Sequence, residues 1–348
     1  MVKLRTISSL STLSGKTVLL RIDTDVDFNH EKILDDTRLT AALPTIKVIL
    51  EKEGKINIIG HLGRPKGEDK KFTLYPIAKW LESKFGGSIG PIVIGKLHGW
   101  KINENVNLFE NLRFFKEEET NDKDFSRELS LLGDIYVNDA FAVSHRAHAS
   151  VEGVTHFLKS YAGIHLEKEV EELSKILEDP KRPLAVLIGG AKIETKLPLV
   201  EKMHHIADYI LVGGEIAEQT RILIKVQHEK IKDTKSAVIV SEASSDGFDI
   251  DQKSIENFCQ ILGLAETIVW NGPVGVTGKG VETEKGTRML AEFITKAKAY
   301  KIVGGGDTVS YLRRVDLLDK FDFVSTGGGA MLEFLSGKKL PGVTALEI

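Results

Sequence analysis

Short apolar segments alternate with longer amphipathic segments along the whole chain, and this alternation limits the possible folds more than any other feature of the sequence. The apolar segments are nearly continuous in Val, Ile and Leu, which is typical of strands that are buried on both faces of a parallel sheet. The amphipathic segments between them have the length of the helices that connect parallel strands. The pattern therefore predicts an α/β fold with doubly wound, Rossmann-like parallel sheets.

The alternation occurs in two blocks. In the first block we predict strands at 17–23, 55–61, 106–110 and 134–139, and helices at 37–53, 74–85 and 124–132. In the second block we predict strands at 184–188, 209–212, 237–240, 267–270, 301–303 and 323–324, and helices at 196–205, 253–262, 284–299 and 308–313. Two blocks in 348 residues predict two domains, because a single core rarely grows to this size.

One amphipathic segment joins the two blocks. Its residues Leu166, Val170, Leu173 and Leu177 follow helical spacing, and Pro180 ends it. We therefore expect a first domain over 1–162, an interdomain helix over 163–180 and a second domain over 181–330, with a cleft between the two domains.

The composition excludes several classes of function. A formal net charge of −3 argues against nucleic acid or an anionic membrane as the main partner. No apolar run approaches the roughly 18 residues of a membrane-spanning helix, and the N-terminal residues show no signal peptide. The single cysteine, Cys259, suits a reducing compartment. We therefore expect a cytoplasmic protein without nucleic-acid or membrane partners.

Glycines follow the predicted strands of the second block. They occur at Gly189-Gly190, Gly213-Gly214, Asn271-Gly272-Pro273, Gly304–Gly306 and Gly327–Gly329. A glycine turn lets bare backbone N–H groups approach an anion, and the N-terminus of the next helix favours negative charge. One glycine pair is weak evidence, since tight turns need glycine anyway, but five in one domain predict an extended anion or nucleotide groove. Lys192 and Lys196 can supply positive charge there, and Asp307 can hold a divalent ion.

Basic side chains follow the predicted strands of the first block. The set comprises His61, Arg64, Arg113 and Arg146, with Arg38 at the start of the first helix and Asp23 after the first strand. Ligands of open parallel sheets bind beyond the carboxyl ends of the strands. A single arginine is more often part of a surface ion pair, but four at one edge favour a bound anion. A basic pocket in one domain and a glycine-lined groove in the other indicate phosphoryl transfer, with closure of the domains around the reacting groups.

Two familiar nucleotide motifs are absent. Gly15-Lys16-Thr17 ends like a Walker A motif, but Leu10 occupies the position of its first glycine. No G-x-G-x-x-G follows the first strand of either block, which argues against a nicotinamide-dependent dehydrogenase.

Long motifs run through the chain. They include Asp35-Asp36-Thr37-Arg38, His61-Leu62-Gly63-Arg64-Pro65-Lys66-Gly67, Glu110-Asn111-Leu112-Arg113-Phe114, Val137-Asn138-Asp139-Ala140-Phe141, His145-Arg146-Ala147-His148, Gly189-Gly190-Ala191-Lys192, Trp270-Asn271-Gly272-Pro273 and Gly304-Gly305-Gly306-Asp307-Thr308. With these motifs the chain resembles the phosphoglycerate kinase family nearly end to end. The resemblance implies reversible phosphoryl transfer from 1,3-bisphosphoglycerate to Mg-ADP, giving 3-phosphoglycerate and ATP. It also implies that segment 331–348 returns to the first domain. We expect small-molecule substrates only and a monomer.

The resemblance also implies roles for individual residues. The residues implied to hold phosphoglycerate are Asp23, Asp25, Arg38, His61, Arg64, Arg113 and Arg146. The residues implied to hold the nucleotide are Gly190, Lys192, Lys196, Gly213, Gly214, Asn271, Gly304, Gly305, Gly306, Asp307 and Thr308, with Asp307 as the ligand of Mg2+. Catalysis would depend on Arg38, Lys196 and Gly328.

The chain departs from the family pattern at several places. Asp25 replaces an asparagine of the substrate pocket, and Glu215 replaces a third glycine. The stretch 220–251 is short, and Thr277-Gly278 stands where the family has Phe-Glu, so the glutamate that binds ribose is missing. Three alternatives stay open on the sequence alone: a weakly active or non-catalytic homologue, a kinase for another small carboxylate, and use of GTP in place of ATP.

Overall fold

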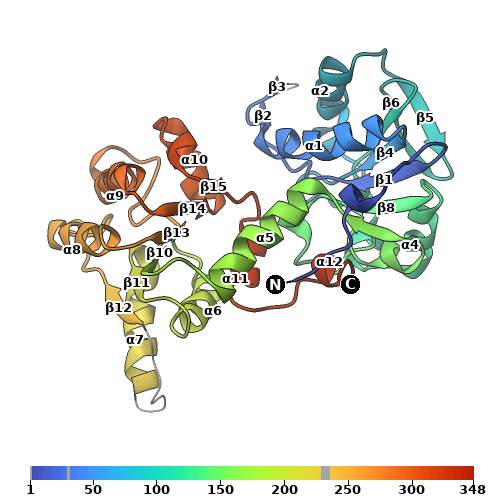
Figure 1. The fold of residues 1–348 in the computed structure, drawn as a ribbon. Helices are drawn as coiled ribbons and strands as arrows, with labels where there is room; N and C mark the ends of the chain where they lie inside the picture. Colours follow the sequence, from blue (N-terminus) through green and yellow to red (C-terminus); the bar gives the residue numbers. More distant parts are fainter. Residues whose placement is uncertain (1, 30–31, 229–235) are drawn as a thin grey trace. The chain divides into compact units, whose positions relative to one another are not determined.

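The computed structural model describes residues 2–29, 32–228 and 236–348, and the chain divides into two compact units (Figure 1). Unit 1 consists of the chain up to Glu171 together with Lys339–Ile348, and unit 2 consists of Glu172–Lys338. The boundary falls inside α5 (Ile164–Glu178), the helix predicted to join the domains. Residues 331–338, which the resemblance assigned to the returning segment, belong to unit 2.

Unit 1 is built on a seven-stranded sheet, as far as the described residues show, with the strand order β5-β6-β7-β4-β1-β8-β9. The strand bounds are β1 (Thr17–Arg21), β4 (Lys55–Ile59), β5 (Gly90–Ile94), β6 (Leu97–Lys101), β7 (Val106–Phe109), β8 (Ile135–Asn138) and β9 (Ser160–Ala162). A separate antiparallel pair is formed by β2 (Phe28–Asn29) and β3 (Lys32–Ile33). The helices of the unit besides its part of α5 are α1 (Thr37–Glu51), α2 (Tyr75–Phe85), α3 (Lys116–Glu119), α4 (Lys123–Ser130) and α12 (Pro341–Thr344).

Two edge pairings of the unit 1 sheet differ from the predicted parallel arrangement. β5 pairs with β6, and β6 with β7, in antiparallel orientation. Only Gly95-Lys96 connect β5 to β6, and Gly95 has φ +59°, a left-handed conformation that suits a two-residue hairpin. A connection this short cannot contain the crossover that parallel neighbours require.

Alternating residues of β1 enter two different cores. Val18 and Leu20 pack with apolar residues of α1 and α2, whereas Leu19 packs with those of α4. Successive side chains of a strand point to opposite faces, so helices cover both faces of this sheet. The central strands are therefore buried on both sides, as their continuous apolar composition predicted.

Unit 2 is built on a six-stranded sheet, again counted over the described residues, with the order β12-β11-β10-β13-β14-β15. Its strands are β10 (Leu184–Ile188), β11 (Tyr209–Val212), β12 (Ala237–Val240), β13 (Thr267–Asn271), β14 (Tyr300–Gly304) and β15 (Phe323–Val324), and all their pairings are parallel. Its helices besides the end of α5 are α6 (Ile193–Met203), α7 (Ala217–His228), α8 (Gln252–Leu262), α9 (Lys285–Lys296), α10 (Gly306–Arg314) and α11 (Gly329–Leu335). The predicted α/β fold with two sheet-based units is confirmed.

Several elements end where the sequence did not predict. β1 and β4 stop at Arg21 and Ile59, two residues earlier than expected, so the side chains of Asp23 and His61 belong to loops at the carboxyl edge of the sheet. α6 begins at Ile193, three residues before the predicted start, which places Lys196 in its first turn. The helix α7 was not predicted, and it is followed by residues outside the described ranges.

The two ends of the described chain lie side by side in unit 1 (Figure 1). Leu4 forms an antiparallel bridge with Glu347, and the Arg5 N–H donates to the Leu346 carbonyl over 2.9 Å. The Ile348 N–H donates to the Lys3 carbonyl over 3.0 Å. None of the described helices has both the length and the apolar composition needed to cross a membrane.

Candidate active site

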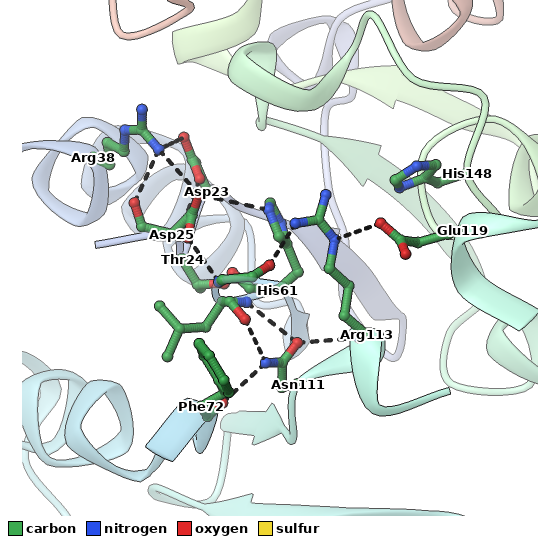
Figure 2. Close-up of polar contacts among 12 residues, drawn as sticks. Asp23, Thr24, Asp25, Arg38, His61, Phe72, Asn111, Arg113, Glu119 and His148 are labelled. Carbon is green, nitrogen blue, oxygen red and sulfur yellow. Dashed lines mark hydrogen bonds and ion pairs between the residues drawn. The ribbon is translucent and has the colours of Figure 1, made fainter. Parts of the chain in front are cut away.

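The carboxyl edge of the unit 1 sheet gathers charged side chains from elements that are distant in sequence. Asp23 and Asp25 follow β1, His61 follows β4, Arg113 follows β7, and Arg38 lies in the first turn of α1 (Figure 2). The parallel pairing of β1 with β4 and of β4 with β7 brings these strand ends together. The sheet topology therefore assembles most of the phosphoglycerate residues that the resemblance implied.

Arg38 is held by the two aspartates. Its Nη1 lies 3.2 Å from Asp23 Oδ2 and donates to the Asp25 carbonyl over 2.9 Å. Burial raises the pKa of the Asp23 carboxyl, while the Arg38 charge opposes that shift and Asp25 adds to it. The Arg38 side chain is one-third exposed, so its guanidinium keeps donors available for an anion from solvent.

Asp25 ties together both loops of this edge. Its Oδ1 accepts from the Gly63 N–H over 2.8 Å, and its Oδ2 lies 3.9 Å from Arg38 Nη1 and 3.9 Å from His61 Nε2. These two longer distances exceed a hydrogen bond, so Oδ2 adds charge to the pocket without being fully paired. An asparagine at this position could keep the Gly63 contact and would remove that charge.

His61 is buried and uncharged at neutral pH. Burial lowers the pKa of His61 well below its usual 6.5, and the charges of Arg21, Arg113 and Arg146 lower it further. The Arg21 guanidinium approaches His61 Nδ1 with a distance of 2.8 Å from Nη2. This histidine can therefore serve an anion as a hydrogen-bond donor but not as a cation.

The remaining arginines of the set differ in their surroundings. Arg113 is buried and donates from Nη1 to the Gly63 carbonyl over 2.6 Å, and its Nε lies 3.4 Å from Glu119 Oε1. Arg146 is half-buried and close enough to lower the pKa values of His61 and Arg113. Arg64 is exposed in the loop after β4.

Sequence reasoning missed three residues behind this pocket. Arg21 is fully buried, and its Nε donates to Ser150 Oγ over 3.0 Å. The Ser150 hydroxyl contacts Glu118, which is also fully buried, over 2.5 Å. A charged residue inside a buried apolar strand needs a partner, so Arg21 carried a signal in the sequence, whereas Ser150 and Glu118 carried none.

In unit 2 the glycine turns adopt backbone conformations that favour glycine. The left-handed φ values are +91° at Gly190, +72° at Gly214, +99° at Gly272, +94° at Gly305 and +46° at Gly328. At Gly272 a Cβ atom would lie 2.1 Å from the Gly189 carbonyl oxygen, because the turns after β13 and β10 meet there. Backbone from neighbouring turns is thus packed more closely than side chains allow.

The turns after β10, β11 and β13 line a cavity of about 710 Å³. Its lining includes Gly190, Gly214, Glu215, Arg221, Ser241, Phe248, Asp249, Pro273, Val276, Thr277, Lys279 and Asp307. The volume lies within the range of small-molecule and cofactor pockets. Lys279 lies in this wall, close in sequence to Thr277-Gly278, with its Nζ 5.6 Å from the Phe248 ring centre.

Lys196 is buried between the turns. Its Nζ donates to the Asn271 carbonyl over 3.0 Å and also contacts Asn271 Oδ1. Burial lowers the pKa of Lys196 to about 7, with Asp307 opposing the shift and Lys192 adding to it. A lysine poised between its two protonation states responds strongly to an arriving phosphate.

Other predicted nucleotide residues support the turns or face solvent. Thr308 is buried, and its Oγ1 accepts from the Gly272 N–H over 2.8 Å. Lys192 is exposed immediately before α6, and Gly213 donates from its N–H to the Ile188 carbonyl. Gly304 ends β14, and Gly306 begins α10.

Asp307 is the candidate ligand for a divalent ion. It lies exposed in the first turn of α10 and lines the cavity. Within the described ranges no three His, Cys, Asp or Glu side chains form a metal-binding group. Mg2+ is commonly bound through one or two carboxylates together with substrate phosphates, so a single carboxylate beside a phosphate groove fits this ion.

Comparison with known proteins identifies the relatives of this chain. The family model described as phosphoglycerate kinase matches residues 7–235 and 219–338. Phosphoglycerate kinase of Dictyoglomus turgidum is 37% identical over 383 residues, covering 96% of each chain. The enzyme of Coprothermobacter proteolyticus is 38% identical over 392 residues, covering 99% of each. Both alignments exceed the 348 residues of this chain, so the relatives carry residues that it lacks.

Solved structures agree with this relationship. Phosphoglycerate kinase from Coxiella burnetii superposes with a TM-score of 0.83 at 33% identity, covering 99% of each chain. Phosphoglycerate kinase from Pyrococcus horikoshii OT3 superposes with a TM-score of 0.81 at 27% identity, covering 99% of this chain and 98% of that one. The motifs, the two sheets, the site residues at their carboxyl edges and these full-length matches lead to one conclusion: the chain belongs to the phosphoglycerate kinase family.

Proposed function

We propose that the chain carries out the reaction of its family with the residues described above. That reaction transfers a phosphoryl group between 1,3-bisphosphoglycerate and Mg-ADP, giving 3-phosphoglycerate and ATP. The observation that carries the assignment is that Arg38, Lys196 and Asp307 lie at the carboxyl edges of their sheets. Phosphoryl transfer demands positioned positive charge and a held metal ion, with little covalent chemistry.

The side chains of unit 1 would hold the phosphoglycerate. Arg113 and Arg146 offer guanidinium donors for its phosphate and carboxylate oxygens, while neutral His61 offers one N–H. Asp23 and Asp25 hold Arg38, and Arg38 would face the phosphoryl group during transfer. The exposed Arg64 would join the site when the ligand is bound.

The turns of unit 2 would hold the nucleotide phosphates through backbone N–H groups. Lys196 in its charged form would stabilise the negative charge that spreads over the transferred group, and Gly328 would offer its N–H beside the N-terminus of α11. Mg2+ would supply charge neutralisation between phosphates, with Asp307 as its protein ligand. Because each unit holds one ligand, transfer requires the units to approach each other during the reaction.

We further propose that the protein works as a cytoplasmic monomer on small molecules. The single cysteine and the near-neutral net charge support this assignment, and a relative from Triticum aestivum is described as cytosolic. Sedimentation at several protein concentrations tests the monomer, since a self-associating chain sediments faster as its concentration rises.

A coupled assay with 3-phosphoglycerate and several nucleoside triphosphates tests the proposed reaction. We expect turnover with both ATP and GTP and a weak preference between them, because the shortened wall of the cavity leaves the phosphate-binding turns in place. Binding without turnover would favour the non-catalytic homologue. Turnover with another small carboxylate in preference to 3-phosphoglycerate would favour a kinase for that carboxylate. Tight and exclusive use of ATP would show that residues such as Phe248 and Lys279 replace the lost wall.

A further inference from the structure

A buried chain of polar groups runs behind the phosphoglycerate pocket and ends at His61. It comprises Glu118 on α3, Ser150 and Arg21 at the end of β1, all of them inaccessible to solvent. None of these three residues reaches the surface on which a ligand could lie, so their polarity needs an explanation other than ligand contact.

The donors and acceptors of these buried groups fix the direction of each hydrogen bond between them. A guanidinium can only donate, so Ser150 Oγ accepts from Arg21 Nε over 3.0 Å, and the Ser150 hydroxyl hydrogen then points to Glu118 Oε1, 2.5 Å away. Glu118 Oε2 accepts from the Ser150 N–H over 2.9 Å. Three hydrogen bonds therefore hold the serine between Arg21 and Glu118.

The same rule fixes the form of the His61 ring. Arg21 Nη2 lies 2.8 Å from His61 Nδ1, and since Arg21 cannot accept, Nδ1 must be the acceptor and carries no hydrogen. The pKa of His61 is lowered well below its usual 6.5 by burial and the surrounding arginines, so the ring is neutral and its one hydrogen is on Nε2. Nε2 faces Asp25 Oδ2 at 3.9 Å, beyond hydrogen-bond distance.

We propose that Ser150 and Glu118 are positioning residues for His61: they hold Arg21 in the orientation that makes His61 Nε2 the hydrogen-bond donor to phosphoglycerate. The inference rests on the proposed function, because it takes phosphoglycerate as the anion in the pocket. Without the serine hydroxyl, Arg21 loses the acceptor for Nε and turns toward Glu118. His61 is then free to place its hydrogen on either nitrogen, and the molecules with Nδ1–H present a lone pair to the anion.

Nitrogen NMR of protein labelled at its histidines tests the first step without any ligand, with His61→Gln used to assign the signal. We expect the parent to show Nδ1 unprotonated and Nε2 protonated. A parent spectrum with Nδ1 protonated overturns the inference, whether or not any variant folds.

The variant Ser150→Ala tests the second step. We expect its His61 signals to move toward the average of the two tautomers. The KM for 3-phosphoglycerate should rise as the Nε2–H fraction falls, by about twofold for an equal mixture of tautomers. The KM for ATP and kcat should change little. Ser150→Thr keeps a hydroxyl and should restore the parent spectrum and KM.

Ser126→Ala is the matched control. Ser126 is also a buried serine of unit 1, but its hydroxyl donates to the Asp122 carbonyl. Equal changes of KM in the two alanine variants, or a changed KM with an unchanged tautomer in Ser150→Ala, would reduce the buried chain to a structural role. A parent that shows the expected tautomer but neither binds nor converts 3-phosphoglycerate would count against the proposed function instead.

Discussion

The two candidate anion sites are built in opposite ways. The candidate site of unit 1 consists of polar side chains, and each is held by another group: Arg38 by Asp23, His61 by Arg21, and Arg113 by the Gly63 carbonyl. Unit 2 uses backbone turns whose shape is set by left-handed glycines. The shortening of the chain falls in unit 2, where the family match divides near residues 219–235. Every residue except proline carries the same backbone N–H group, so we expect a turn to bind phosphate even when the surrounding wall is reduced.

This comparison predicts that phosphoryl transfer depends on very few side chains of unit 2. Substitution of Lys196 should have the largest effect. Lys196→Met removes a buried charge that counts mainly in the transition state, so we expect kcat to fall by on the order of a thousandfold. The KM values for ATP and 3-phosphoglycerate should change far less. Stopped-flow or coupled rates with both substrates varied measure the split.

The exposed Lys202 on the same helix provides the control for Lys196. Lys202→Met should leave kcat within about twofold of the parent, as is usual for surface substitutions. An unchanged kcat in Lys196→Met would remove the catalytic role of this lysine and leave the turns of unit 2 as a binding device only.

Adding a Cβ atom to a glycine in these turns should destabilise the fold. In Gly272→Ala the new atom would lie 2.1 Å from the Gly189 carbonyl oxygen, at a φ of +99°. We expect a loss of about 3 kcal/mol or more in the free energy of unfolding, from backbone strain and the clash, together with weaker nucleotide binding. Urea unfolding and nucleotide titration measure the two effects.

Gly278 separates the clash from the strain. It has a φ of +89° but open space where its Cβ would be, so Gly278→Ala should cost only about 1 kcal/mol. Similar losses in both alanine variants would mean that close packing of the turns contributes nothing beyond their conformation.

In unit 1 one substitution should strengthen ligand binding, whereas the substitutions in unit 2 weaken binding or turnover. Asp25→Asn keeps the contact to the Gly63 N–H and removes a negative charge near Arg38 and His61. We expect the KM for 3-phosphoglycerate to fall about fivefold, which corresponds to about 1 kcal/mol, the scale of a partly exposed charge pair. The KM for ATP should stay constant.

Asp27 is an exposed aspartate two residues away, and Asp27→Asn controls for the loss of charge on the surface. Asp25→Asn could instead raise the KM for 3-phosphoglycerate. The carboxylate would then organise the arginines or accept a hydrogen bond from the substrate, and aspartate would suit this position better than asparagine.

The smallest expected effect is the uptake of a fraction of one proton by Lys196 when nucleotide binds. The pKa of Lys196 is about 7 in the folded protein against an ordinary 10.5, so the unfolded chain binds more protons in this window and stability from this group rises as pH increases from 7 to 10.5. Nucleotide phosphates favour the charged amine, so binding at pH 8 should take up a proton. Calorimetry in buffers with different ionisation enthalpies measures the uptake, which should vanish in Lys196→Met.

The sequence predicted those features that produce a local pattern of residues. Strands of β10 and β13 are continuous apolar runs, and the turns after them need glycine, so both are visible in the composition. The hairpin of β5 and β6 was not predicted, because Gly90-Pro91 argues against a strand and the burial of β5 is only partial.

The buried chain behind His61 could not be predicted for a different reason. Arg21 and Ser150 are separated by 129 residues, and Ser150 and Glu118 by 32. Whether a serine lies between two charges depends on the packing of three elements, and no local pattern records it. The sequence therefore identified the candidate ligand-binding groups at the strand ends, but not the buried groups that orient them.

The pairing of the chain ends has a consequence for biosynthesis. Leu4 forms its bridge with Glu347, the Arg5 N–H donates to the Leu346 carbonyl, and the segment from Lys339 onward belongs to unit 1. Unit 2, in contrast, is one continuous stretch of chain. Domains usually fold during translation in the order in which they leave the ribosome. Here the unit that is synthesised first lacks its closing contacts until the last ten residues have emerged, so unit 2 has all of its residues before unit 1 does.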